Sequence, residues 1–419
     1  MAESLRCTTG KALTDGSVLV ALGALHAGVD FFVGYPITPA SSIFAEMIRR
    51  GVGIAAPDEI TALQYLIGAS LNGRKAMTAT SGPGFLLMAE GIGEALMMEA
   101  PLTVVLVQRL GPATGSATMN AQGDVGLVGS IVSGGFLCPV VCPARVEECA
   151  ELTVRAVNLA ETLRVPAVLL TEKEMVVGKR SLDLSRLRLP EPVARTGYGG
   201  DPAAFASYGN LDAREVPAFR PLGDREVQLR VTASTHDARG MIASFSERVR
   251  HSTERLMVTD RWRELYPAAT LDRQEGAGDL VLSYGFTSYA AEDAVGRLRA
   301  AGHRVSHLTV RTIYPVLREE LRAALAGVQR VFLPEENLTG QYRRLLLAEG
   351  VLGGLPPEAV VSLAVMGRPI APEEIVRAVL GTASRRGAAD RAGEADAAGG
   401  ASGSGGDTAG GRATREVQR

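Results

Sequence analysis

Short apolar runs alternate with amphipathic segments over residues 16 to 175. The runs FFVGYP, KAMTATSG, PLTVVLVQR and VPAVLLTE have the length and composition of buried strands. The segments between them carry apolar residues at helical spacing, and Gly51 and Gly73 follow two of them, as glycine does after a helix C-terminus. The alternation predicts an α/β domain with a mostly parallel sheet over residues 10–178.

The rest of the chain divides into three further regions. Residues 179–275 lose the alternation and are rich in Arg, Pro and Gly, which predicts a connecting region with short strands and one helix. Strand and helix patterns return over residues 276–381 and predict a second α/β unit, in which RVSHLTVRTIYP is expected to form one strand. Residues 382–419 are low-complexity Ala, Gly and Ser without an apolar face, which predicts a disordered tail.

Charge and cysteine content narrow the class of protein. Among 419 residues, 44 Lys and Arg nearly balance 46 Asp and Glu, and no basic stripe is present, so nucleic acid is not an expected partner. The sequence carries no long apolar stretch and no signal-peptide pattern, which predicts a cytoplasmic protein without membrane contact. Cys7, Cys138, Cys142 and Cys149 match neither zinc nor ferredoxin spacing, so we expect buried thiols and no metal site in this chain.

The turn after the first strand, GYPITPASS, is the first place to look for chemistry, because ligands of open parallel sheets bind beyond the carboxyl ends of the strands. Thr38 precedes Pro39 and a helical run, which predicts threonine as the N-cap and proline as the first helical residue. A well-capped helix explains these residues by itself. The same cap would also place the Thr38 hydroxyl at the rim of a pocket.

Two further turns carry polar residues or glycines at the start of a helix. Asp58 and Glu59 precede a helical run, where acidic side chains complement the helix dipole, an effect that accounts for one of them. Ser81 to Gly84 spell SGPG between a strand and a Met-rich apolar helix, so the turn is either purely structural or brings backbone close to a ligand. It is neither a P-loop nor a dinucleotide fingerprint.

Arg109 leaves the fully apolar strand PLTVVLVQ at its carboxyl end. A guanidinium there is well placed to bind a carboxylate through two parallel hydrogen bonds. A structural ion pair with an acidic side chain of the same chain is the competing interpretation.

Together, these stretches resemble a known family. The stretches GYPITPASS, DEITALQYLIGASLNGRKAMTATSGPG, GEALMMEAPLTVVLVQRLGPATG and QGDV are similar to the alpha subunit of the 2-oxoacid:ferredoxin oxidoreductases, which are thiamine-diphosphate enzymes. LVLSYGFTSYAAEDAVGRLRAAGHRVSHLTVRTIYP and LPEENLTGQYRRLL resemble that family's second domain. The resemblance implies an α/β fold, with a thiamine-diphosphate-binding, pyrimidine-type parallel-sheet domain followed by a transketolase-C-terminal-like α/β domain.

The resemblance also implies roles for individual residues. Glu59 matches the catalytic glutamate that binds N1′ of the aminopyrimidine, and Thr38 and Arg109 match residues that contact the 2-oxoacid substrate. Both roles are chemically sensible, because proton transfer needs a positioned carboxylate and decarboxylation needs an oriented substrate. The residues expected to line the cofactor are Tyr35, Pro36, Glu59, Ser81 and Gly82.

Motifs that the family needs but this chain lacks imply partner chains. The sequence has no GDG motif for the diphosphate and its magnesium, and no cysteine set for an iron-sulfur cluster. The resemblance therefore implies that Mg2+ and a 4Fe-4S cluster sit on a beta subunit, which shares the thiamine diphosphate with this chain. Ferredoxin is the implied electron acceptor and coenzyme A the co-substrate, and a gamma subunit is either separate or missing.

The reaction implied is oxidative decarboxylation of a 2-oxoacid to an acyl-CoA and CO2, with 2-oxoglutarate as the first candidate. Leu110, Ser116 and Met119 depart from the family pattern near the substrate, so pyruvate and branched-chain or aryl 2-oxoacids remain alternatives. A non-oxidative thiamine decarboxylase or carboligase split over two chains is a further alternative. A scaffold protein on a decayed fold is the non-enzyme alternative, because a fold does not guarantee a function.

Overall fold

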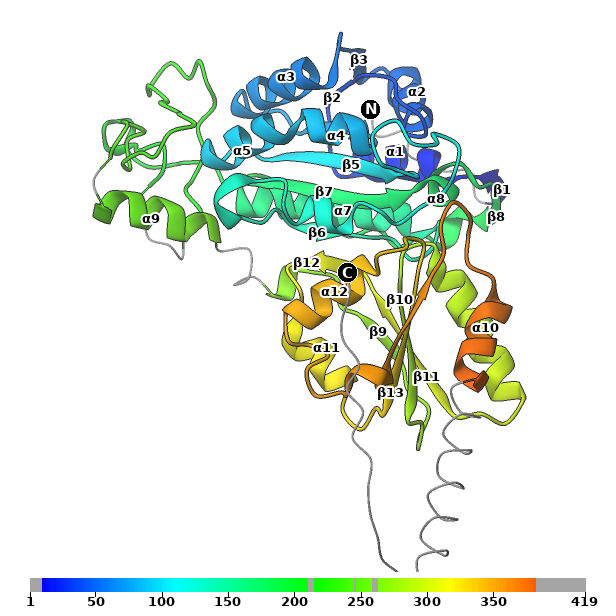
Figure 1. The fold of residues 1–419 in the computed structure, drawn as a ribbon. Helices are drawn as coiled ribbons and strands as arrows, with labels where there is room; N and C mark the ends of the chain where they lie inside the picture. Colours follow the sequence, from blue (N-terminus) through cyan, green and yellow to red (C-terminus); the bar gives the residue numbers. More distant parts are fainter. Residues whose placement is uncertain (1–9, 210–214, 245, 258–262, 382–419) are drawn as a thin grey trace, which may run out of the picture. The chain divides into compact units, whose positions relative to one another are not determined.

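The computed structural model describes residues 10–209, 215–244, 246–257 and 263–381. Cys7 and the tail predicted at residues 382–419 lie outside the described residues. The described chain contains two large sheets, and each sheet with its covering helices forms an α/β part (Figure 1). The predicted α/β class, with a mostly parallel sheet, is confirmed.

The first sheet has seven strands in the order β12-β6-β7-β5-β4-β2-β3, and all neighbours are parallel except β12 and β6. Its strands are β2 (Phe31–Gly34), β3 (Gly53–Ala55), β4 (Ala76–Thr80), β5 (Leu102–Gln108), β6 (Val140–Val141), β7 (Pro166–Glu172) and β12 (Thr312–Tyr314). The associated helices are α1 (Gly16–His26), α2 (Ser41–Arg49), α3 (Glu59–Leu71), α4 (Gly82–Leu87), α5 (Ala89–Met97), α6 (Val125–Val128), α7 (Glu148–Leu163) and α8 (Lys173–Val177).

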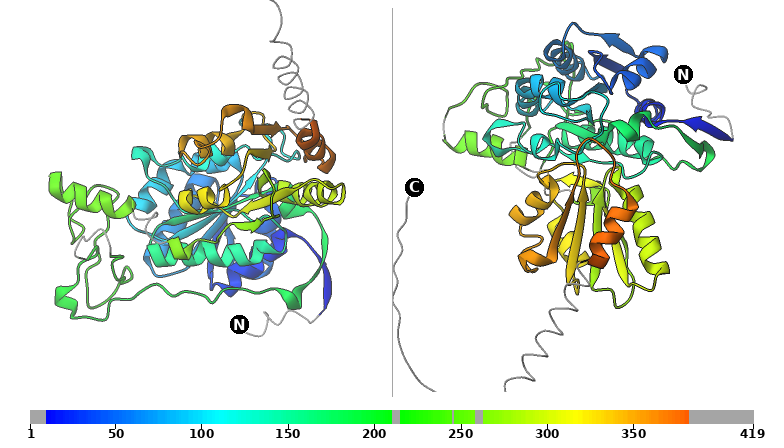
Figure 2. Two further views of the ribbon diagram at one scale, coloured as in Figure 1. Left: turned by 90° about the horizontal axis from the view of Figure 1, so that it is seen from below. Right: turned by 45° about the vertical axis from the view of Figure 1, so that its right-hand side comes forward.

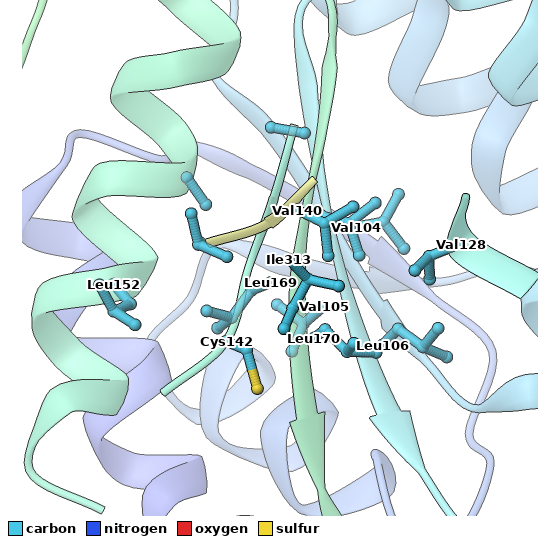
Figure 3. Packing of buried hydrophobic residues seen from close by; sticks show 14 of the residues in the cluster. Val104, Val105, Leu106, Val128, Val140, Cys142, Leu152, Leu169, Leu170 and Ile313 are labelled. Carbon is cyan, nitrogen blue, oxygen red and sulfur yellow. The ribbon is translucent and has the colours of Figure 1, made fainter. Parts of the chain in front are cut away.

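The core of this sheet follows from its sequence. Every residue of β5 and β7 is buried, as expected for central strands of a parallel sheet covered on both faces. Val104 and Leu106 of β5, Leu169 of β7 and Leu152 of α7 belong to one buried cluster, and Figure 3 shows Leu152 on the helix beside the strands. Cys142 belongs to the same cluster, and burial raises the pKa of its thiol well above the usual range, so it packs as an apolar residue.

The second sheet has five strands in the order β14-β13-β10-β11-β9, in which only β9 is antiparallel to its neighbour. Its strands are β9 (Thr270–Asp272), β10 (Asp279–Tyr284), β11 (Val305–Val310), β13 (Arg330–Glu335) and β14 (Val360–Ala364). Its helices are α10 (Thr287–Ala300), α11 (Arg318–Ala324) and α12 (Gln341–Ala348).

The run RVSHLTVRTIYP does not form the single strand that its pattern predicts. It divides into β11, which pairs with β10, and β12, which leaves the second sheet and pairs antiparallel with β6 of the first. Thr312 lies opposite Val141, and Ile313 is fully buried in the core of the first sheet (Figure 3). One continuous apolar run thus contributes to both sheets.

The connecting region is held by arginines. Its strand β8 (Arg180–Asp183) pairs with β1 (Lys11–Thr14), as the views of Figure 2 show, and its helix α9 spans Ser246–Leu256. Arg195 pairs with the buried carboxylate of Glu161 at 2.9 Å, and Arg255 forms a buried ion pair with Glu99. The described part of the chain contains no helix long and apolar enough to span a membrane.

A buried histidine makes the fold sensitive to acid. Ser283 Oγ of β10 lies 2.8 Å from His307 Nε2 of β11, and burial lowers the pKa of His307 to about 4. The unfolded chain binds a proton at this residue below pH ~6.5 while the native chain does not, so the free energy of unfolding falls as the pH drops from about 6.5 to about 4.

Glutamine at position 307 does not titrate, so the His307→Gln variant should lose less stability in acid than wild type. We expect the fall in the free energy of unfolding between about pH 6.5 and pH 4 to be smaller by up to about 3 kcal/mol. Urea unfolding at several pH values measures it, and parallel curves for both proteins would contradict it.

Candidate active site

The turn after β2 differs from the predicted cap. Helix α2 begins at Ser41 with Ala40 as its N-cap, and no side chain caps it. Residues 38 to 40 instead form a turn closed by the bond from Ser41 N to Ile37 O (2.9 Å), and the Thr38–Pro39 peptide bond is cis. The prediction of Thr38 as N-cap and Pro39 as first helical residue is therefore wrong, since the backbone turns before the helix starts.

Thr38 nevertheless lies at the edge of the sheet where the candidate residues meet. Its carbonyl oxygen accepts a hydrogen bond from Arg109 Nη1, and its side chain is exposed. Tyr35 and Pro36 are exposed on the same turn, Tyr35 by 41%. The structure thus links Thr38 to Arg109 and leaves the rings of Tyr35 and Pro36 at the surface.

Glu59 is a buried carboxylate at the first position of α3. Asp58 is the N-cap and accepts a bond from Thr61 N (2.7 Å), so the acidic residue that complements the helix start is Asp58. Glu59 is only 5% exposed, and no hydrogen bond to its carboxylate is formed within the described ranges. A buried carboxylate is costly without a partner, which is what a site for a hydrogen-bonding ligand requires.

The Ser81–Gly84 turn packs directly against Glu59. A Cβ on Gly84 would overlap the Glu59 carboxylate and the Thr80 hydroxyl, so glycine is required there by close approach. Two polar atoms at the ends of the adjacent strands β4 and β5, Ser81 Oγ and Gln108 Nε2, are buried without a partner among the residues that the structure describes. The Met-rich run after the turn forms α4 and α5 instead of one helix, and Leu86 and Leu87 are half exposed.

This packing predicts a contrast between two glycines. Gly84→Ala is expected to destabilise the chain by about 1–3 kcal/mol, because the added methyl group has no space beside Glu59. Gly93→Ala, in α5, is the matched control, since a Cβ there meets nothing within 4 Å and alanine favours the helix by up to about 1 kcal/mol. Urea unfolding of both variants measures the contrast, and equal midpoints would show that the contact with Glu59 is not tight.

Arg109 follows the last residue of β5 and is 7% exposed. It forms no ion pair with an acidic side chain of the described chain, which disfavours the structural interpretation of this residue. Thr38 O holds Nη1, whereas Nε is buried without a partner in the same set of residues. The guanidinium is therefore held in place through Nη1, and its other N–H groups remain available to donate to a carboxylate.

Asp124 is a site residue that the sequence reasoning missed. Its backbone N–H donates to Gln108 Oε1 (3.0 Å), and a Cβ on Gly82 would lie 3.3 Å from its carboxylate oxygens. Burial raises the pKa of Asp124 to about 6, and nearby Arg109 opposes that shift. Asp124 is the aspartate of the QGDV stretch, which resembles the family, so the sequence could have indicated it as a site residue.

Arg109 and Asp124 line a cleft with a volume of about 520 Å³. One wall comes from Gly82, Pro83 and the segment after β5, including Leu110, and the other from residues Glu336 to Gln341, which follow β13. Glu59 and Thr38 do not line this cleft: Glu59 lies on the other side of the Ser81–Gly84 turn. The described residues contain no cluster of His, Cys, Asp and Glu that could hold a metal ion.

Comparison with known proteins gives the family. Residues 22–243 match the family model described as "Pyruvate flavodoxin/ferredoxin oxidoreductase, thiamine diP-bdg". The 2-oxoglutarate synthase subunit KorA of Methanothermobacter marburgensis is 34% identical over 388 residues, which cover 89% of this chain and 99% of that protein. The chain belongs to the 2-oxoacid:ferredoxin oxidoreductase alpha-subunit family. KorA of Methanocaldococcus jannaschii is 32% identical over 390 residues, or 88% of this chain and 98% of the relative.

A solved member of this oxidoreductase family has the same fold. The 2-oxoglutarate:ferredoxin oxidoreductase from Magnetococcus marinus, with 2-oxoglutarate, coenzyme A and succinyl-CoA bound, superposes with a TM-score of 0.79 at 27% identity. The match covers 88% of this chain, which spans 65% of the length of that one. The predicted family and fold class are confirmed, and the relatives are named as subunits of larger enzymes.

The site of this family member fits thiamine diphosphate on its own chemistry. The aminopyrimidine ring of the cofactor offers both hydrogen-bond donors and acceptors. The unpartnered groups around the Ser81–Gly84 turn are of the matching kinds: the Glu59 carboxylate accepts, Gln108 Nε2 donates, and Ser81 Oγ can do either.

Proposed function

We propose that this chain is the alpha subunit of an enzyme that oxidatively decarboxylates a 2-oxoacid, with 2-oxoglutarate as the first candidate. The products are the acyl-CoA and CO2, and the electrons pass to ferredoxin. The observation that carries the proposal is that Glu59 and Arg109 flank one glycine-rich turn, each without an ion-pair partner among the described residues. The names of the KorA relatives and the ligands of the M. marinus enzyme favour 2-oxoglutarate.

Each residue has a separate task in this proposal. When bound, thiamine diphosphate supplies a nucleophilic carbon and accepts the negative charge that decarboxylation releases. Glu59 holds or gives up a proton at the aminopyrimidine N1′, and the Ser81–Gly84 turn lets the ring approach the backbone. Arg109 binds the substrate carboxylate, with Thr38 O fixing the guanidinium. Tyr35, Pro36, Ser81 and Gly82 are proposed to line the cofactor.

The proposal needs a partner. A beta subunit would supply the diphosphate and Mg2+ site and a 4Fe-4S cluster, and the complex would work with ferredoxin in the cytoplasm, with or without a gamma subunit. Donors for a diphosphate are absent from the motifs of this chain, so it would be inactive alone. Pyruvate and branched-chain or aryl 2-oxoacids are the substrate alternatives.

The test is to co-express this chain with the neighbouring beta chain and to measure methyl viologen reduction with a panel of 2-oxoacids. Reduction that requires both coenzyme A and a 2-oxoacid, with 2-oxoglutarate preferred, is the expected result. CO2 release without viologen reduction, from a beta chain that lacks cluster-forming cysteines, would favour the non-oxidative decarboxylase or carboligase instead.

A further inference from the structure

Gln122 lies fully buried between the two α/β parts, with every polar atom of its side chain bonded. Its Oε1 accepts from Glu336 N (3.0 Å), and its Nε2 donates to Glu172 Oε1 (2.9 Å) and Tyr284 O (3.1 Å). Glu172 ends β7 of the first sheet, while Tyr284 ends β10 of the second. One side chain thus joins the carboxyl edges of the two sheets.

The backbone around Gln122 is held in the same way by residues after β13. Gln122 N donates to Glu336 O (3.0 Å), and Asn337 Nδ2 donates to Gln122 O (3.0 Å). Gln341, at the start of α12, donates to Gly123 O (2.6 Å) and accepts from Gly126 N (2.8 Å). Residues 335–341, the EENLTGQ part of the stretch LPEENLTGQYRRLL, therefore hold a segment of the first α/β part in place.

The segment ends at the candidate substrate site. Asp124, two residues after Gln122, is tied to Gln108 at the end of β5 and lies beside Gly82. Arg109 is close enough for its positive charge to oppose the rise that burial causes in the pKa of Asp124. A shift of the segment would therefore move Asp124 relative to the guanidinium.

Two buried acidic side chains, Glu172 and Glu336, depend on the same contacts. Burial, followed by the nearby Glu336, raises the pKa of Glu172 to about 8, and burial raises the pKa of Glu336 to about 7. Gln122 and Asn120 donate to these carboxylates. If the segment shifted, these buried acidic groups would lose their donors, which disfavours other positions of the segment.

We propose that Gln122 and Gln341 are positioning residues, which hold residues 120–126 so that Asp124 keeps its place beside Arg109 at the cleft. The second α/β part would then act on the substrate site through this one segment. The kinetic consequence rests on the proposed function. That Gln122 and Gln341 hold residues 120–126 in place does not rest on it.

The kinetic test uses the complex of alpha and beta chains. Gln122→Met and Gln341→Met remove the hydrogen bonds and keep the approximate length of the side chain, and exposed Gln329→Met is the matched control. Arg109 would bind the substrate carboxylate equally in the ground state and in the transition state. We therefore expect KM for the 2-oxoacid to rise about tenfold, with kcat within about threefold of wild type. In an Asp124→Asn background, the Gln341→Met variant should add little, since both changes act through one residue.

A second readout separates this proposal from the proposed function. Hydrogen–deuterium exchange of peptides spanning residues 120–126 should be faster in Gln122→Met and Gln341→Met than in wild type, and unchanged in Gln329→Met. If Gln122→Met does not fold, Gln341→Met alone decides, because its side chain is only part-buried. Unchanged exchange, or an unchanged KM in an active complex, would overturn the proposal. If exchange were faster but the complex were inactive on every 2-oxoacid, the result would support the role of Gln122 and Gln341 in holding residues 120–126 and would reject the proposed function.

Discussion

Glu59→Gln is expected to lower kcat of the reconstituted complex by about 10²- to 10⁴-fold, the range that a positioned proton-transfer group contributes. Glutamine keeps the size of the side chain, but its amide cannot exchange a proton with a ring nitrogen. The carboxylate of Glu59 has no hydrogen-bond partner within the described residues, so the substitution breaks no hydrogen bond there and keeps the packing against Gly84. The loss should therefore appear in catalysis and not in the free energy of unfolding.

The matched control is Glu90→Gln, which changes an exposed carboxylate in the first turn of α5. It should leave kcat unchanged, and KM for the 2-oxoacid should stay within about threefold of wild type in both variants. Activity of the Glu59→Gln complex near that of wild type would reject the catalytic role and favour the scaffold interpretation of the fold.

The sequence identified most elements of the first sheet, because their apolar runs are longer and more regular than the turns around them. Gly51 and Gly73 follow the C-termini of their helices, as predicted, and both have a positive φ. The division of RVSHLTVRTIYP was not predictable from periodicity, since both halves alternate in the same way. It follows from the pairing of Thr312 with Val141, a contact between residues far apart in the chain.

The candidate site shows the same limit. Glu59 and Arg109 could be proposed because each stands at the end of a recognisable element, and both lie at the carboxyl edge of the sheet. The cap predicted at Thr38 failed because a Thr-Pro pair fits the start of a helix and a tight turn equally well. Gln122 escaped notice because its partners, Glu172, Tyr284 and Glu336, come from three distant segments.

Arg109→Ala is expected to lower kcat/KM for every accepted 2-oxoacid by about 100-fold, chiefly through KM, since charged hydrogen bonds of up to about 3 kcal/mol are lost. Arg109→Lys keeps the charge but loses the planar fork, so it should recover only part of that loss. Thr38 O would remain without its guanidinium partner in the alanine variant. The lysine variant therefore separates the loss of charge from the loss of geometry.

Arg74→Ala provides the matched control, because Arg74 precedes β4 at the opposite edge of the same sheet and pairs with Asp30 in solvent. An exposed pair contributes at most about 1 kcal/mol, and no substrate is expected to reach that edge. Steady-state kinetics over the full substrate panel measure both variants. If Arg109→Ala changed KM and kcat no more than Arg74→Ala does, the carboxylate would have to be bound elsewhere. The hydrogen bond from Arg109 Nη1 to Thr38 O would then stabilise the turn after β2 and have no role in binding the substrate.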